Sequence, residues 1–173
     1  MGADDETTLD VATPADAPLL ANLLELYIHD LSEIFPIALG ADGRFGYDKL
    51  PLYWSEPGQR FAFLVRAAGR VAGFVLATRG SPASDDPEAL DVAEFFVLRG
   101  DRRSGIGRRA ALLLWEHIPG RWVVRVSEAN RAGLPFWKSV VAEYTRGEFS
   151  ERELPGDPHG WCILSFRSRS VTG

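Results

Sequence analysis

The chain of 173 residues has one cysteine and three histidines, and this scarcity excludes several kinds of site. A lone cysteine, Cys162, cannot form an intramolecular disulfide or a thiolate metal cluster. The three histidines are dispersed and lack the spacing of metal ligands. We therefore expect no metal site.

Long apolar runs and an excess of basic residues are also missing. No segment approaches the roughly 20 apolar residues that span a bilayer, and the acidic start MGADDETTLDVATP lacks the apolar core of a signal peptide. The formal net charge of −5 argues against a general nucleic-acid binder. We expect a soluble, cytoplasmic protein, monomeric or homodimeric, without a membrane or nucleic-acid partner.

The composition that is present is typical of a globular protein. Hydrophobic residues make up 46% and charged residues 25% of the chain. A chain of this length can bury about two-thirds of its unfolded surface. Because we find no internal repeat and no long linker, we expect residues 1–173 to form a single domain.

Hydrophobic periodicity predicts alternating strands and helices. A short strand precedes a helix that Thr13 caps and Pro14 begins. Residues 38–60 lack periodicity and predict a partly helical excursion near a binding surface, whereas residues 60–80 have the pattern of a β-hairpin. The remaining order predicts a mixed α/β sheet with helices on both faces. Its strands fall at 90–98, 121–128, 143–151 and 160–168, and its helices at 105–118 and 130–143.

The turn after the strand at 90–98 combines glycine with arginine. Gly105-Ile106-Gly107 opens the following helix, and five arginines surround it: Arg99, Arg102, Arg103, Arg108 and Arg109. A helix N-terminus offers about four unpaired N–H groups and a partial positive charge. Glycine lets a ligand approach the backbone, and arginine forms bidentate hydrogen bonds with phosphate. The residues themselves therefore predict a cradle for phosphate or pyrophosphate.

Three other interpretations of this turn compete with a cradle. One is a solvated, arginine-rich helix start. It does not explain the two glycines, each of which costs about 1 kcal/mol in helix propensity relative to alanine. A dinucleotide fingerprint fits Gly105 to Ala110 as G-x-G-x-x-A, with Glu128 as the ribose-binding acid, but it needs a tighter turn and more strands than follow. A P-loop needs Gly-Lys-Ser/Thr, which is absent.

The segment VLRGDRRSGIGRRAA resembles motif A of the GNAT superfamily of acyl-CoA-dependent N-acetyltransferases. That motif consists of a strand that ends in valine, followed by Gln/Arg-x-x-Gly-x-Gly/Ala at the start of a helix. In this chain the valine is Val97, and the glycine pattern runs from Arg102 to Gly107. The segment EANRAGLPFWKSVVAEY resembles the next part of the family pattern, with Asn130, Phe136 and Trp137 in its positions. The resemblance implies a GNAT fold. In that fold a mostly antiparallel sheet of about six to seven strands is splayed where coenzyme A binds.

The same resemblance implies an enzyme that transfers acetyl from acetyl-CoA to a primary amine. The backbone N–H groups of the glycine turn would hold the pyrophosphate, with arginine side chains nearby, and Val97 and Leu98 would pair with the pantetheine arm. The implied coenzyme site is Val97, Leu98, Arg102, Arg103, Ser104, Gly105, Ile106, Gly107, Arg108, Asn130, Phe136 and Trp137. A non-catalytic module that binds acyl-CoA as a sensor or regulator is the alternative, and an acyl group longer than acetyl stays open.

A base is needed to remove the proton of an alkylammonium before it attacks the thioester. Alternation along the strand at 90–98 places Glu94 on one face and Asp91 on the other. The family often has a substrate-side acid three residues before the motif valine, and Glu94 occupies that position. We expect Glu94 to be the catalytic base; the alternative is a structural carboxylate in an ion pair.

The general acid of many family members is missing. They have a tyrosine where this chain has Trp137, whose indole cannot donate a proton at working pH. Solvent or another group must then protonate the leaving thiolate, and Tyr144 is the nearest downstream tyrosine. Gly133 and Pro135 also depart from the family pattern and predict a shifted or irregular helix start.

Acceptors in the family bind to the first helices and to the loops that follow them. Aromatic and acidic residues gather there in this chain. They suit a small-molecule or peptide amine such as a polyamine, an aminoglycoside or a lysine side chain. The candidate acceptor-binding residues are Tyr27, Asp30, Tyr47 and Trp54.

Overall fold

A computed structural model describes residues 6–169, which form one sheet of seven strands in the order β1-β2-β3-β4-β5-β7-β6. Neighbouring strands are antiparallel except for β4 and β5, which are parallel. The mixed, mostly antiparallel sheet predicted from the sequence is therefore confirmed. The strands are β1 (Thr7–Val11), β2 (Arg60–Ala67), β3 (Arg70–Arg79), β4 (Leu90–Val97), β5 (Arg121–Ser127), β6 (Ser150–Leu154) and β7 (Trp161–Arg167).

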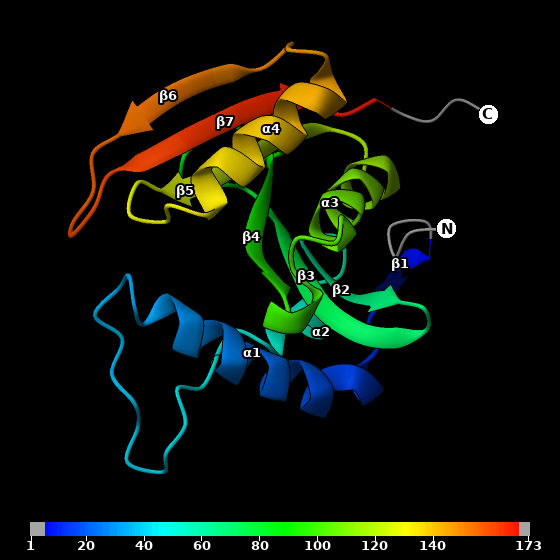
Figure 1. Cartoon of the computed structure of the whole chain (residues 1–173), viewed down its shortest axis with the longest axis vertical. Coiled ribbons are helices and arrows are strands. Elements are labelled where there is room, and N and C mark those ends of the chain that lie inside the picture. Colours follow the sequence, from blue (N-terminus) through cyan, green and yellow to red (C-terminus); the bar gives the residue numbers. More distant parts are fainter. Residues whose placement is uncertain (1–5, 170–173) are drawn as a thin grey trace.

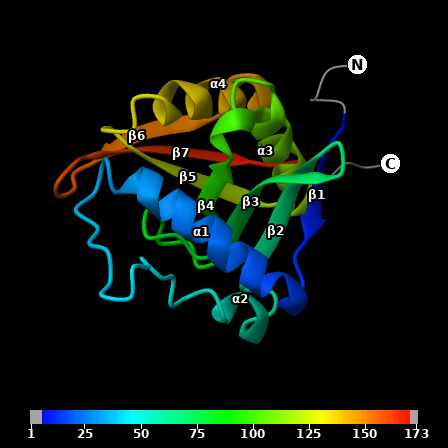
Figure 2. The ribbon, with the colours of Figure 1, turned by 60° about the horizontal axis from the view of Figure 1, so that its bottom comes forward.

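Helices cover both faces of this sheet, as predicted. On one face, α1 (Ala17–Leu31) and α2 (Leu52–Ser55) pack against β2, β3 and β4. On the other face lie α3 (Ile106–His117) and α4 (Gly133–Thr145) (Figures 1 and 2), which bury a larger apolar cluster. Short 3₁₀ helices, η1 (Pro14–Asp16) and η2 (Arg99–Asp101), precede α1 and α3. Within residues 6–169, no helix is long and apolar enough to cross a membrane, and no three His, Cys, Asp or Glu side chains are grouped as metal ligands.

The boundaries of α4 and β6 differ from the prediction of a strand at 143–151. The helix continues to Thr145 because Arg146 and Gly147, with φ of 55° and 84°, form its left-handed end. The Gly147 N–H then donates to the carbonyl of Ala142 at 2.9 Å, which closes the last turn. The strand β6 consequently begins only at Ser150.

A bulge in β4 decides which of its side chains share a face. Two consecutive residues of β3 pair with Glu94 and Val92, so that Ala93 is an extra residue on β4. Val92 therefore packs under α3 and α4, while Asp91 lies on the same face as Glu94. The predicted alternation, which put Asp91 and Glu94 on opposite faces, was wrong because one extra residue reverses the order.

The strands β4 and β5 pair only where they begin. Their ladder consists of Leu90 with Trp122 and Asp91 with Val123, although β4 continues to Val97 and β5 to Ser127. Beyond Asp91 the two strands diverge, as the ribbon of β4 shows in Figure 1. This divergence is the splay that the GNAT resemblance implies.

Candidate active site

Glu94 lies at the divergence of β4 and β5, where two phenols hold it. The hydroxyl of Tyr27, from α1, donates to Oε2 at 2.6 Å, and the hydroxyl of Tyr47 donates to Oε1 at 3.1 Å. Tyr27 is itself fixed edge-on against Phe74, with ring centroids 5.6 Å apart. The structure thus brings two predicted acceptor-side residues, Tyr27 and Tyr47, to the predicted base.

The excursion at 38–60 reaches this site because α1 binds it. The two carboxylate oxygens of Glu25 accept the backbone N–H groups of Phe45 and Gly46, each at 2.8 Å. Tyr47 follows immediately and extends to Glu94. The helical part of the predicted excursion is confined to α2.

Burial raises the pKa of Glu94 above its ordinary value. The two phenols and the charge of Arg125 favour the carboxylate but do not offset the cost of burying it. The pKa values of Tyr27 and Tyr47 are also raised, mainly by burial and then by the charge of Glu94, so both remain protonated donors. A carboxylate with a raised pKa is a better proton acceptor near neutral pH.

We expect Glu94→Gln to be more stable than the wild type at neutral pH. Because the folded pKa of Glu94 lies above the unfolded one, its contribution to stability is complete below the unfolded pKa and is lost as the pH rises through the folded pKa. Glutamine stays neutral and can still bond both phenols. The difference in Tm between variant and wild type, measured by calorimetry from pH 4 to pH 8, should therefore grow with pH. A difference independent of pH would contradict this account of Glu94.

Arg125 of β5 is a site residue that the sequence analysis missed. Its Nε and Nη2 donate to the two carboxylate oxygens of Asp91 at 2.9 and 2.7 Å. The Ser81 hydroxyl donates to Asp91 at 2.6 Å, and the Asp91 side chain is only 1% exposed. A signal was available in the sequence, because Arg125 in RWVVRVS and the acids Asp91 and Glu94 in LDVAEFFV lie inside apolar strands, where an unpaired charge is costly.

The other two predicted acceptor residues lie away from Glu94. The Trp54 indole donates to the carbonyl of Ala12 at 3.4 Å and packs in the apolar cluster beneath α1. Asp30 accepts from Arg99 at 2.6 Å and from Arg102 at 2.7 Å, so it joins α1 to the glycine turn. These hydrogen bonds and charges hold the pKa of Asp30 below its ordinary value, despite its partial burial.

The turn between β4 and α3 has the backbone of an anion-binding site. Arg103 and Gly105 adopt left-handed conformations, with φ of 61° and 86°. Left-handed residues in a turn direct successive N–H groups toward one side. Within the part of the chain that the structure describes, the N–H groups of residues 103–107 donate to no acceptor. A helix N-terminus with such free donors can hold anionic oxygens.

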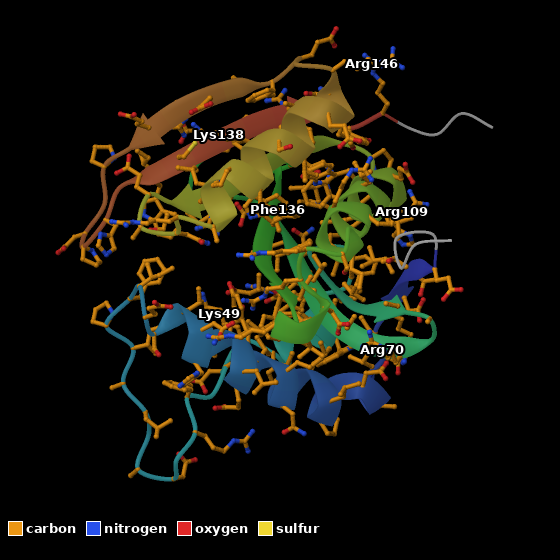
Figure 3. The ribbon with its side chains drawn as sticks, in the orientation of Figure 1. Lys49, Arg70, Arg109, Phe136, Lys138 and Arg146 are labelled. Carbon is orange, nitrogen blue, oxygen red and sulfur yellow. The ribbon has the colours of Figure 1, made fainter. Side chains whose placement is uncertain are left out.

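Most arginine side chains around this turn are paired with acids, which differs from the expectation that they gather at phosphates. Arg99 and Arg102 bind Asp30, and Arg102 also donates from Nε to the Val97 carbonyl at 2.8 Å. Arg108 binds a glutamate of α4, with its Nε 2.8 Å from the carboxylate. Arg103 and Arg109 (Figure 3) form no ion pair with any described residue. These two are the side chains available to a phosphate.

Gly107, in the first turn of α3, faces Phe136 and β4 at a distance where an added Cβ would make ordinary van der Waals contacts. A Cβ at this position would lie 3.4 Å from the Phe136 ring and 3.6 Å from Val97. Phe136 lies between α3 and α4 (Figure 3), half-buried on the predicted coenzyme side. Trp137 points inward, is 8% exposed, and packs edge-on against Phe95 with centroids 4.8 Å apart. Of the predicted aromatic pair, Trp137 therefore belongs to the core.

Asn130 caps the start of α4. Its Oδ1 accepts the Gly133 N–H at 2.8 Å. A Cβ at position 133 would lie 2.7 Å from Cγ of Asn130, so glycine is what permits this cap. Pro135 is the third residue of α4, where the missing N–H would have had no partner within the helix. The helix consequently begins at Gly133 rather than at 130, which is the shifted start that the sequence predicts.

Tyr144 packs on the α3 and α4 side of the sheet, whereas Glu94 is bonded by Tyr27 on the α1 side, so the structure does not bring this predicted general acid to the predicted base. The Tyr144 ring packs against Trp115 at 5.0 Å, and its hydroxyl accepts the Arg169 N–H at 3.4 Å. It lines a separate hollow of about 210 Å³ at the C-terminal ends of α3 and α4.

Solved acetyltransferase structures match this chain over nearly its whole length. An acetyltransferase from Thermus thermophilus has a TM-score of 0.68 at 20% identity, covering 95% of this chain and 98% of that one. The spermidine N-acetyltransferase of Vibrio cholerae, solved with CoA and spermine, has a TM-score of 0.63 at 15% identity, covering 95% and 96%. The ribosomal-protein-S18-alanine N-acetyltransferase of Escherichia coli has a TM-score of 0.59 at 15% identity, covering 96% of each chain.

No family sequence model and no curated protein sequence matches the chain. The structural matches nonetheless superpose on this chain over more than nine-tenths of each chain. At identities of 20% or less they establish the fold, and the chain has the fold of the GNAT N-acetyltransferases.

Proposed function

We propose that the protein transfers the acetyl group of acetyl-CoA to the amine of a small molecule or peptide. The observation that carries this proposal is the position of Glu94. It is a partly buried carboxylate with a raised pKa, fixed by two phenols where β4 and β5 diverge. The same strand leads directly to a helix start with free N–H groups.

The residues of the turn fit a coenzyme A pyrophosphate. The free N–H groups of 103–107 and the unpaired side chains of Arg103 and Arg109 provide donors for its oxygens. The Val97 carbonyl now accepts from Arg102, and the Leu98 N–H donates to Ala72 at 2.8 Å. A pantetheine arm that paired with Val97 would therefore compete with the Arg102 side chain.

In the proposed reaction, Glu94 accepts a proton from the acceptor ammonium, directly or through water. The free amine attacks the carbonyl carbon of the thioester, an N–C bond forms, the nitrogen loses its second proton to solvent, and the C–S bond breaks. The thiolate then takes a proton from solvent. A thiol with a pKa of about 8.5 leaves without a dedicated acid, which suits a site in which Trp137 is buried and Tyr144 is remote.

Binding of acetyl-CoA is expected to stabilise the protein markedly. At about 100 times its Kd, a ligand adds about 2.7 kcal/mol to the free energy of unfolding. For a chain of this length we expect a rise in Tm of about 5 to 10 °C, measured by differential scanning fluorimetry with ATP at the same concentration as the control. The absence of a shift at millimolar acetyl-CoA would contradict the proposal.

Turnover separates an enzyme from a binding module of the same fold. Free-thiol release from acetyl-CoA is measured with polyamines, aminoglycosides, lysine peptides and amino acids as acceptors. We expect release that depends on the amine. A thermal shift without release from any of these amines would favour a non-catalytic acyl-CoA sensor.

A further inference from the structure

Arg125 and Glu94 face each other where β4 and β5 diverge. The last ladder pair is Asp91 with Val123, and side chains two positions further along a strand return to the same face. On β5 that position is Arg125; on β4 it is Glu94, because Ala93 is bulged. They are the first side chains beyond the ladder on the α1 face, and their charges interact.

The guanidinium of Arg125 is fixed on one edge and free on the other. Nε and Nη2 are both bonded to Asp91, whereas Nη1 donates to no acceptor among residues 6–169. Asp91 is 1% exposed and Arg125 is 24% exposed. The exposed member of this ion pair is therefore the Arg125 side chain, whose guanidinium is fixed by two hydrogen bonds to Asp91 and keeps the two N–H donors of Nη1 unused among the described residues.

An apolar wall adjoins that free edge. The guanidinium of Arg125 lies 6.0 Å from the ring centroid of Trp161, at the start of β7. Phe35, just after α1, stacks on Trp161 with centroids 5.7 Å apart and an interplanar angle of 17°. The wall joins the α1 side of the site to the β7 side and offers aromatic surface to a ligand.

We propose that the free edge of Arg125 binds a carboxylate of the acceptor and thereby sets the acceptor amine beside Glu94. The acceptor is then an amino carboxylate, and its carbon skeleton packs near Phe35 and Trp161. This inference names the acceptor class of the function proposed above and depends on it. An ammonium matches Glu94 and a carboxylate matches Arg125, whereas a second ammonium, as in a polyamine, would meet the guanidinium.

Matched acceptors test this proposal in the wild-type protein. Thiol release is measured with phenylalanine, methionine and leucine, with their carboxamides, and with the corresponding amines that lack the carboxyl group. We expect kcat/KM to be about 10- to 100-fold higher for the acids, because a charge-assisted hydrogen bond between the carboxylate and Arg125 contributes a factor of this size. Because the ammonium of an amino acid is harder to deprotonate than that of its carboxamide, a preference for the acids over the carboxamides cannot arise from amine reactivity, and this comparison is the decisive one.

Two arginines of β5 supply the variant and its control. Arg125→Lys keeps a cation beside Asp91 but loses the free guanidinium edge, and we expect it to reduce the preference for acids at least tenfold. Arg121→Lys alters the other arginine, which binds Asp86 at 3.0 Å outside this site, and should keep the preference. Both variants should retain the thermal shift with acetyl-CoA.

Equal or faster release with the carboxamides or the simple amines would overturn the inference and leave the proposed function standing. An unchanged preference in Arg125→Lys would also overturn it. No release with any amine would overturn the proposed function, and the inference with it. If Arg125→Lys fails to fold, the comparison of acceptors in the wild type decides.

Discussion

Replacing Glu94 with glutamine is expected to lower kcat by about 10²- to 10⁴-fold, the usual contribution of a positioned base. The amide cannot accept the ammonium proton, but it fills the same space and can bond Tyr27 and Tyr47. The Tm shift with acetyl-CoA should therefore remain as in the wild type. Steady-state thiol release at saturating acetyl-CoA measures the loss.

The pH dependence of the same reaction identifies the group. In the wild type, kcat/KM should rise with pH as Glu94 loses its proton, and its raised pKa moves this rise toward neutral pH. Tyr27→Phe removes a hydrogen bond that lowers the pKa of Glu94, so the rise should move to still higher pH, with a loss of about tenfold or less in rate. If Glu94→Gln kept kcat within threefold and the same rise, Glu94 would not be the base.

The second large effect is expected from Gly73→Ala, which should lower the free energy of unfolding by about 3 kcal/mol or more. A Cβ at this position of β3 would lie 2.9 Å from the carbonyl carbon of Phe96 and 3.0 Å from Cα of Val97, and nearer still to the Phe96 oxygen. These are backbone atoms, so β3 and β4 would have to separate. Because Val97 pairs with Gly73, the shift would also displace the segment that carries Glu94.

Gly100→Ala is the matched control for this substitution. Gly100 lies in η2, and a Cβ added there would have nothing within 4 Å, so the same chemical change should alter stability by less than about 0.5 kcal/mol. Thermal unfolding should show a Tm about 6 to 12 °C lower for Gly73→Ala. Equal Tm values for the two variants would show that the close approach of β3 and β4 does not constrain the sheet.

Local signals in the sequence were sufficient for most of the fold. The hairpin of β2 and β3 turns at Ala68 and Gly69, both left-handed, and its alternating residues predict two strands. The glycine turn can be recognised in the sequence because glycine is a poor helix former. Its presence at the helix start, as Gly105, indicates that the backbone is left-handed there. Such features depend on a few neighbouring residues, which the sequence displays directly.

The electrostatics of the site depend on contacts between distant residues and could not be predicted in that way. The bulge at Ala93 arises from the pairing of β4 with β3, and without it Asp91 would face away from Glu94. Asp91 and Arg125 are 34 residues apart, and only the parallel pairing of β4 with β5 joins them. Asp30 was likewise expected at the acceptor, but the fold brings it to the arginines of the turn.

Amine-dependent release of free thiol from acetyl-CoA, compared between the wild type and Glu94→Gln, decides whether the protein is an acetyltransferase with Glu94 as its base. We expect release in the wild type that requires an amine and rises with pH, and its near loss in a variant that still binds acetyl-CoA. Wild-type protein that binds acetyl-CoA but releases no thiol with any amine, or a Glu94→Gln variant as fast as the wild type, would contradict this expectation.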